Sequence, residues 1–158
     1  MKAFQCFHWK ASVRLALPDR LDRSDSSEMT DFQTLEQANS SFYELFETSD
    51  IEGMADLWVN TEESWCTHPG WPTIFGWDQI RVSFEQIFSG LELPQFLISN
   101  IRYHGDEQTA WIFVEENLLG SSLSAVAAVN VFKKSHEIWN MVGHQAAPLI
   151  PDLNLDSN

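Results

Sequence analysis

Hydrophobic residues recur at two different spacings along this chain, and the change of spacing divides it into a helical half and a strand half. From Asp31 to Gly90 they recur every three or four residues, as on one face of an α-helix. From Phe96 to His144 they alternate with polar residues or run together in β-branched and aromatic segments. Helices gathered before strands predict an α+β domain.

Three helices and one strand are predicted in the first half. Thr34 and Gln37 form a capping box, which places the start of the first helix there. Asp50 suits the N-cap of a short second helix, and Gly90 stops the third. The expected helices cover residues 34–47, 50–58 and 76–90, and the expected strand covers 62–68 and ends at a Pro-Gly turn.

Four strands are predicted in the second half, with short polar connections between them. Connections of this length join antiparallel neighbours, so we expect a meander with the helices on one face of a curved sheet. A sheet bent over a long helix encloses a space, and a ligand would sit at its mouth. The strands are expected over residues 96–104, 109–119, 125–133 and 138–144.

Charge is distributed unevenly along the chain. Residues 1–23 carry five basic and two acidic groups, whereas the rest carries four basic and twenty-one acidic groups. The N-terminal segment is either a disordered arm or an extension before a translation start at Met29, and we favour these over a targeting segment. The predicted organisation is an arm over 1–30, a folded domain over 31–148 and a polar tail over 149–158.

The net charge of −14 argues against two classes of partner. Such a surface repels phosphate backbones and anionic lipids, so we expect neither nucleic-acid nor membrane binding. Cys6 and Cys66 have no CxxC spacing and form neither a disulfide framework nor a zinc pattern. This cysteine usage suits a reducing compartment, and we expect a cytoplasmic protein. No apolar run approaches the length of a membrane span.

Aromatic residues are unusually frequent, with seven Trp and eleven Phe. Large rings bury much area each, so they predict a core or a cavity walled by aromatic side chains. Tryptophans at structural spacings are first of all core residues, and a few would line the cavity. Such walls favour an unknown small hydrophobic or aromatic ligand. The candidate ligand-binding residues are Trp65, Trp71, Trp77, Trp111, Asn130 and Trp139.

Four segments carry a recognisable pattern in order along the chain: Trp65–Trp71 followed by Gly76-Trp77, then Ala110–Glu115, Val129–Phe132 and Trp139–His144. Together they resemble the SnoaL-like branch of the nuclear transport factor 2-like superfamily, and the resemblance covers roughly residues 34–148. It implies a cone-shaped fold, in which a strongly bent, mainly antiparallel sheet wraps around three helices and encloses a pocket. It also implies a homodimer through the outer face of the sheet, as many members form.

The resemblance leaves the function open, because members include ketosteroid-isomerase-like enzymes, polyketide cyclases, hydratases and pure binding modules. Similar members often carry consecutive histidines near the end of the domain. Here only His144 is present, between Gly143 and Gln145.

Glu115 is the first candidate for acid–base chemistry. By strand alternation it shares a face with Trp111 and Phe113, where desolvation would raise the pKa of its carboxyl toward neutrality. Such a group suits a general acid or base. Alternatively, Glu115 accepts hydrogen bonds that only fix the sheet, or it faces the outer surface, since Glu116 takes the other face.

His68 and His144 complete the candidate catalytic set. Either histidine could carry a proton or orient a carboxylate. In the alternative interpretation His68 is a turn residue bonded to nearby backbone, and His144 is a buried histidine that stabilises a strand end. With Glu115 the two could form a metal site, but they lack close ligand spacing, and we predict neither a metal nor a cofactor.

The sequence therefore favours two functions. The first is a small-molecule-binding domain with isomerase-like, cyclase-like or hydrolase-like acid–base catalysis by Glu115, His68 and His144. The second is a non-catalytic dimeric module that binds a ligand or a protein. No nucleophile elbow, zinc-protease motif or phosphate-binding loop is present in the sequence.

Overall fold

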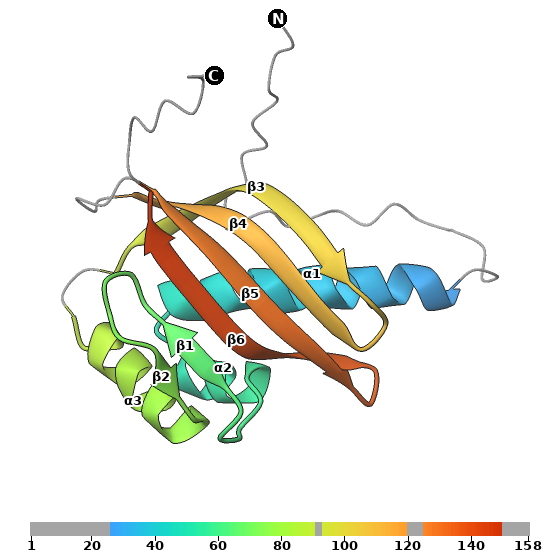
Figure 1. Ribbon diagram of the computed structural model, residues 1–158, viewed down its shortest axis with the longest axis horizontal. Helices are drawn as coiled ribbons and strands as arrows, with labels where there is room; N and C mark the ends of the chain where they lie inside the picture. Colours follow the sequence, from blue (N-terminus) through green and yellow to red (C-terminus); the bar gives the residue numbers. More distant parts are fainter. Residues whose placement is uncertain (1–25, 91–92, 120–124, 150–158) are drawn as a thin grey trace, which may run out of the picture.

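The computed structural model describes residues 26–90, 93–119 and 125–149, with side chains from Leu35 onward. Three helices and six strands confirm the predicted α+β class (Figure 1). The helices are α1 (Ser26–Glu47), α2 (Ile51–Leu57) and α3 (Trp77–Phe88). The strands are β1 (Trp65–Thr67), β2 (Ile74–Phe75), β3 (Gln95–Gly105), β4 (Thr109–Leu119), β5 (Val126–Ser135) and β6 (Ile138–Pro148).

The six strands form one mixed sheet in the order β2-β1-β6-β5-β4-β3. The predicted meander is confirmed, since β3 to β6 pair antiparallel with their chain neighbours. β1 joins β6 in parallel, and β2 pairs with β1. β2 was not predicted because two residues are too few to show a period.

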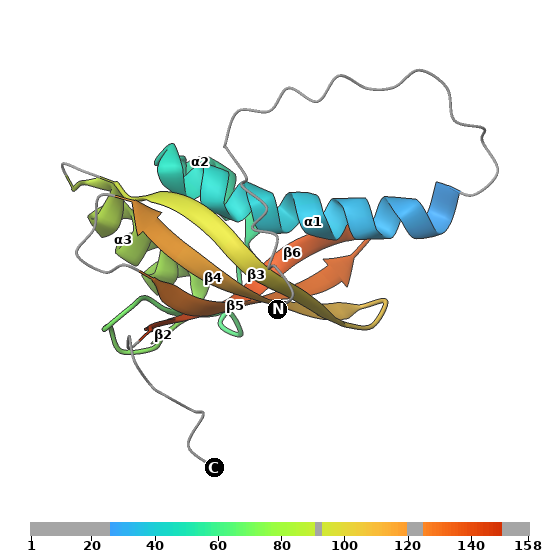
Figure 2. The same ribbon diagram turned by 90° about the horizontal axis from the view of Figure 1, so that it is seen from above.

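Two register shifts bend this sheet. One lies in β3 between Ser99 and Arg102, where Asn100 takes the left-handed conformation with φ 52°. The other lies where Val131 and Phe132 of β5 pair with β6. Bulges of this kind bend a strand and increase its twist. The sheet consequently curls along α1, while α2 and α3 lie toward one end (Figures 1 and 2).

The helices follow the predicted pattern except at the start of α1. Thr34 is not a cap, because α1 begins eight residues earlier, at Ser26. No proline or glycine lies between Ser26 and Thr34, so nothing stops the helix there. The Asp50 cap is confirmed, since its carboxylate accepts a hydrogen bond from the backbone N–H of Gly53 at 2.9 Å.

The core lies between α1, α3 and the inner face of the sheet. Phe42 of α1 is at its centre and contacts the rings of Trp58 and Phe84 edge-on. Burying each ring of this size contributes on the order of 2–3 kcal/mol. The inner face of the sheet completes the core with fully buried side chains, among them Ile112, Phe132 and Met141.

The predicted terminal segments fall mostly outside the described residues. Residues 26–30 of the predicted arm belong to α1, whereas residues 1–25 and 150–158 are not described. Among the described helices, none has both the length and the apolar character needed to cross a membrane.

Candidate functional site

A cavity of about 200 Å³ lies between the two longer helices, α1 and α3, and the inner face of the sheet. Its walls are mainly aromatic and aliphatic, with three titratable side chains among them. Such a mixture of apolar walls and a few converging polar groups is typical of a ligand site. The lining residues are Phe42, Phe46, His68, Pro69, Trp71, Ile87, Pro94, Phe96, Glu116, Leu118 and His144.

The carboxylate that reaches this cavity is Glu116 of β4. Its side chain lies on the inner face with Ile112 and Val114, and only 3% of the residue is exposed. Tyr43 of α1 donates a hydrogen bond of 2.9 Å to Glu116 Oε1. Burial raises the pKa of Glu116 to about 7, and the Tyr43 hydrogen bond opposes part of that rise.

The prediction that Glu115 faces the pocket is wrong. Its side chain lies on the outer face of β4 and is half-buried there, and Asn100 Nδ2 donates to its Oε2 at 2.6 Å. Successive residues of a strand point to opposite faces, so the two glutamates cannot both reach the cavity. The outward placement, which the sequence left open, is the one found.

Asn130 of β5 is fully buried, and its side chain links polar groups of α1 to His144 of β6. Its Nδ2 donates to Asn39 Oδ1 and to Tyr43 Oη, each at 2.9 Å. Its Oδ1 lies 2.7 Å from His144 Nδ1. Asn130 is therefore not part of the cavity wall, and it holds Tyr43 and His144 in position.

His68 follows β1 and packs between the rings of Trp71 and Phe84. Its Nε2 lies 2.9 Å from Ser83 Oγ of α3. Burial lowers the pKa of His68 to about 4. Burial, together with the nearby His68, lowers the pKa of His144 to about 3. Both imidazoles are consequently neutral near pH 7.

Cys66 is buried beside the His68 ring, but it does not supply a nucleophile. Its Sγ is 3.9 Å from Nδ1 and 3.8 Å from Nε2 of His68. Burial, and to a lesser degree the charge of Glu116, raises the pKa of the Cys66 thiol above its usual range. The thiolate, which is the reactive form, is therefore disfavoured.

Of the tryptophans predicted to bind a ligand, Trp71 lines the cavity. Trp65 instead lies against Gly143, Trp77 packs against Trp58 in the core, and Trp111 is 39% exposed on the outer face. The prediction that these three tryptophans line the pocket is wrong. Strand and helix spacing shows which residues share a face, but it does not show which face borders a cavity.

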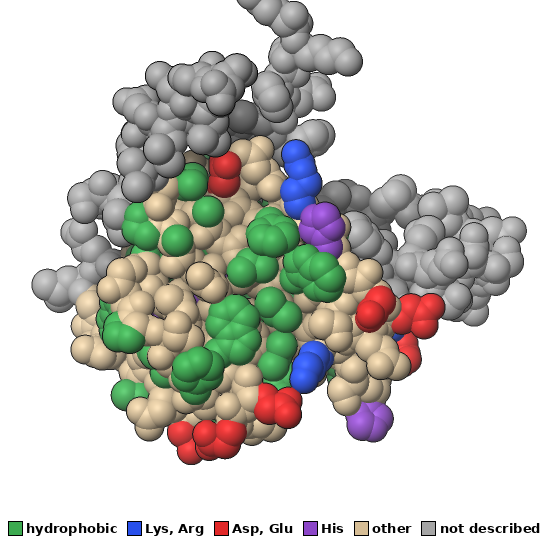
Figure 3. Space-filling model, in the orientation of Figure 1, with side chains coloured by type: hydrophobic (Ala, Val, Ile, Leu, Met, Phe, Trp, Pro, Cys, Tyr) green, Lys and Arg blue, Asp and Glu red, His purple; other side chains and the backbone are tan. Residues whose placement is uncertain are grey.

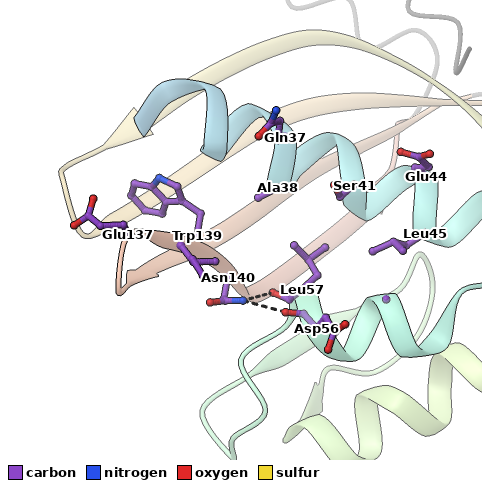
Figure 4. Close-up of a pocket in the computed structure, with 12 residues that line it drawn as sticks. Gln37, Ala38, Ser41, Glu44, Leu45, Asp56, Leu57, Glu137, Trp139 and Asn140 are labelled. Atoms are coloured by element: carbon purple, nitrogen blue, oxygen red, sulfur yellow. Dashed lines mark hydrogen bonds between the residues drawn. The ribbon is translucent and has the colours of Figure 1, made fainter. Parts of the chain in front are cut away.

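Trp139 lines a second, larger hollow of about 550 Å³ between α1, α2 and the β5–β6 hairpin. Figure 4 shows the indole of Trp139 beneath α1, with Leu57 and the backbone-bonded Asn140 beside it. The charged groups of this second hollow are the carboxylates of Glu44, Asp56 and Glu137, and no histidine lines it. We therefore take the smaller cavity as the candidate site.

The predicted set of His68, His144 and Glu115 does not form a metal site, since Glu115 points away from the two histidines. Within the described ranges, no three His, Cys, Asp or Glu side chains are grouped to hold a metal ion.

Residues 35–151 match the family of the SnoaL-like domain. The chain belongs to the SnoaL-like domain family. The resemblance read from the sequence is thereby confirmed, and the cone-shaped architecture is that of nuclear transport factor 2-like proteins.

Solved structures share the architecture of this SnoaL-like domain. A candidate dehydratase of the NTF2-like family from Streptomyces avermitilis is 29% identical with a TM-score of 0.70, covering 77% of this chain and 98% of that one. A candidate calcium/calmodulin-dependent protein kinase type II association domain from Thiobacillus denitrificans is 24% identical with a TM-score of 0.68, covering 74% and 96%.

One curated protein, the F-box protein SKIP8 of Arabidopsis thaliana, is 22% identical over 114 residues. The match takes in 72% of this SnoaL-like domain chain and 49% of that protein. The chain thus spans about half the length of this relative.

Proposed function

We propose that this SnoaL-like domain binds a small molecule in the cavity and that Glu116 transfers a proton to and from it. His68 and His144, which line the same cavity, are neutral and are available to bind the small molecule. The observation that carries the proposal is a buried carboxyl group, with a pKa raised to about 7, on the wall of a largely apolar cavity. A strongly shifted titratable group in a cavity is the usual signature of an acid–base site.

Glu116 is suited to both halves of a proton transfer. With a pKa near 7, its carboxyl group is present in charged and neutral forms at neutral pH, so it can accept a proton and return it. Tyr43 binds Oε1 and fixes the side chain, which leaves Oε2 as the atom that takes the proton. The apolar rings of Phe42 and Phe46 hold the substrate and keep water away.

The reactions that fit are those that begin by removing a proton from a carbon next to a carbonyl group. Isomerisation and elimination of water both begin this way, and a cyclisation of the aldol type does too. The similarity to a candidate dehydratase at 29% identity supports this class. No cofactor is needed for such a transfer, and we propose none.

Deuterium uptake tests the proposal without knowledge of the natural substrate. The full chain is incubated in D2O with a panel of small enolisable ketones, and incorporation is followed by mass spectrometry. We expect uptake above the buffer rate in the wild type and in Glu115→Gln, and loss of at least tenfold in Glu116→Gln. Equal uptake in wild type and Glu116→Gln would contradict the proposal.

We further propose that the chain forms a homodimer through the outer face of the sheet. Trp111 and Phe113 of β4 are 39% and 47% exposed there, and the register places Val131 and Val129 of β5 beside them. Figure 3 shows hydrophobic side chains gathered on this face. Contiguous exposed apolar surface of this kind is typical of an interaction site.

The same face also favours the second candidate, a non-catalytic dimeric binding module. In that case the hydrogen bonds among Asn130, Tyr43 and Glu116 would serve only to stabilise the interior. A dimer without deuterium uptake on any ketone of the panel would favour this second function.

A further inference from the structure

The hydrogen bonds around the cavity decide which polar atoms remain for a ligand. Asn130 Nδ2 has two protons, and it donates one to Asn39 and one to Tyr43. The atom that Asn130 turns toward His144 is therefore its carbonyl oxygen, which can only accept. His144 must carry its proton on Nδ1 to make this 2.7 Å bond.

The other nitrogen of His144 is consequently a hydrogen-bond acceptor. A neutral imidazole has one N–H and one lone pair, so Nε2 keeps the lone pair. No side chain in the described part of the structure donates to Nε2, although His144 is only 4% exposed. Among the described residues, the fully buried side-chain nitrogens and oxygens without a partner are Trp58 Nε1 and Trp139 Nε1, so His144 Nε2 is not one of them. It is open to the cavity that His144 lines, where a donor on a ligand can bind it.

His68 reaches the same state by a different route. Ser83 Oγ donates its only proton to the carbonyl oxygen of Ile80 at 2.7 Å, so it accepts from His68 Nε2–H. The lone pair of His68 is thereby left on Nδ1. Cys66 Sγ lies 3.9 Å from Nδ1 and 3.8 Å from Nε2, and a thiol is only a weak donor, so a ligand O–H or N–H is the stronger partner for this lone pair.

Glu116 adds a third acceptor to the cavity. Its Oε1 is bound by Tyr43, while Oε2 has no partner among the described residues. The remaining walls are largely apolar, with Phe42 and Phe46 of α1 and Leu118 of β4 among them. The polar atoms open to a ligand are therefore acceptors, and the Glu116 carboxylate repels a ligand that is already an anion. Once Glu116 has taken a proton from a substrate it is neutral, and this repulsion is gone.

The size of the cavity limits the ligand further. An apolar cavity of about 150 Å³ is known to hold benzene, and this one has about 200 Å³. This volume holds one six-membered ring with a small substituent.

We propose that the cavity binds neutral, single-ring compounds that donate an O–H or N–H hydrogen bond to His144 Nε2 or His68 Nδ1, and that it excludes anions of the same size. This inference rests on the cavity of the proposed function and names the class of molecule that it takes. It concerns binding, and it holds whether or not Glu116 catalyses a reaction.

Phenol, anisole and benzoate test this specificity on the full chain. Anisole is phenol with a methyl group in place of the donated proton, and benzoate is an anion on the same ring. Titration calorimetry at about pH 8, with Trp fluorescence as a second signal, should give about tenfold tighter binding for phenol than for anisole. Benzoate should bind more weakly than either. Equal affinity for phenol and anisole, or tighter binding of benzoate, overturns the proposal.

The tautomers can be measured without a ligand. Long-range proton–nitrogen spectra of the ¹⁵N-histidine-labelled chain should show His144 protonated on Nδ1 and His68 on Nε2, with His144→Gln and His68→Gln used to assign the signals. A His144 protonated on Nε2 would overturn the acceptor assignment.

The two proposals fail in different ways. A preference for phenol over anisole in a chain that takes up no deuterium supports this inference and contradicts the catalytic role of Glu116. Deuterium uptake that depends on Glu116, in a chain that binds anisole as tightly as phenol, does the reverse.

Discussion

Burial sets the chemistry of individual side chains in this protein. Glu116, His68 and His144 all lie within the fold, and in each case desolvation disfavours the charged form. The carboxyl pKa therefore rises while the imidazole pKa values fall. At neutral pH this leaves one group that exchanges protons readily beside two that remain neutral.

This arrangement predicts how Glu116 affects stability across pH. Its pKa in the folded chain, about 7, lies above the ordinary value of 4.5, so the folded state holds the proton more tightly. The contribution of Glu116 to stability is present at low pH and is lost as pH rises through about 7. The difference in unfolding free energy, wild type minus Glu116→Gln, should fall by roughly 3 kcal/mol between about pH 4.5 and 7.

Urea denaturation of both proteins at several pH values measures this difference. His68 and His144 act in the opposite direction, since their lowered pKa values add stability above about pH 6.5 that is lost on acidification. Both proteins contain these histidines, so their effect cancels in the difference. A difference that stayed constant or rose with pH would contradict the raised pKa.

At the scale of elements, the junction of β1 with β6 joins the site to the meander. β1 pairs in parallel with β6, and this pairing aligns Trp65 with Gly143 and Cys66 with His144. The indole of Trp65 covers Gly143 so closely that a Cβ there would overlap the ring. Glycine is required at this position by the close approach of the indole.

Gly143→Ala should therefore destabilise the chain by about 1–3 kcal/mol, because the overlap forces Trp65 or the strand to move. The double variant Gly143→Ala with Trp65→Ala should lose less than the sum of the two single variants, as expected for side chains in contact. Thermal or urea unfolding of the four proteins completes the cycle. Strictly additive losses would show that the two positions do not interact.

At the scale of the whole molecule, the two faces of the sheet differ in what they present. The inner face carries the cavity, and the outer face carries the exposed Trp111 and Phe113. If two copies pair through the outer face, Trp111→Glu should place an unpaired charge in the interface and yield a monomer. The cavity lies on the other face and should be unaffected.

Sedimentation velocity separates these states. The wild type should sediment with twice the chain mass of 18.1 kDa, and Trp111→Glu with the single mass. Val82→Glu serves as the control, because Val82 is an exposed hydrophobic residue on α3, away from the sheet. A monomeric wild type, or a dimer that survives Trp111→Glu, would contradict the proposed interface.

The sequence predicted the fold well because the fold follows from spacing. Helical and strand periods gave three helices, a meander and the α+β class, and the structure contains all of them. The site was predicted less well, since alternation separates Glu115 from Glu116 without saying which face turns inward. Glu116 turns inward because α1 packs on that face and supplies Tyr43, which is seventy-three residues away in the chain, as its hydrogen-bond donor.

The titration of Glu116 tests the central claim most directly. Carbon-13 spectra of the glutamate side-chain carboxyls, recorded on the full chain from about pH 3 to 9, should contain one signal that titrates near pH 7. That signal should vanish in Glu116→Gln and persist in Glu115→Gln. If no carboxyl titrates near neutrality, or if the signal is lost in Glu115→Gln instead, Glu116 is not the acid–base group of this cavity.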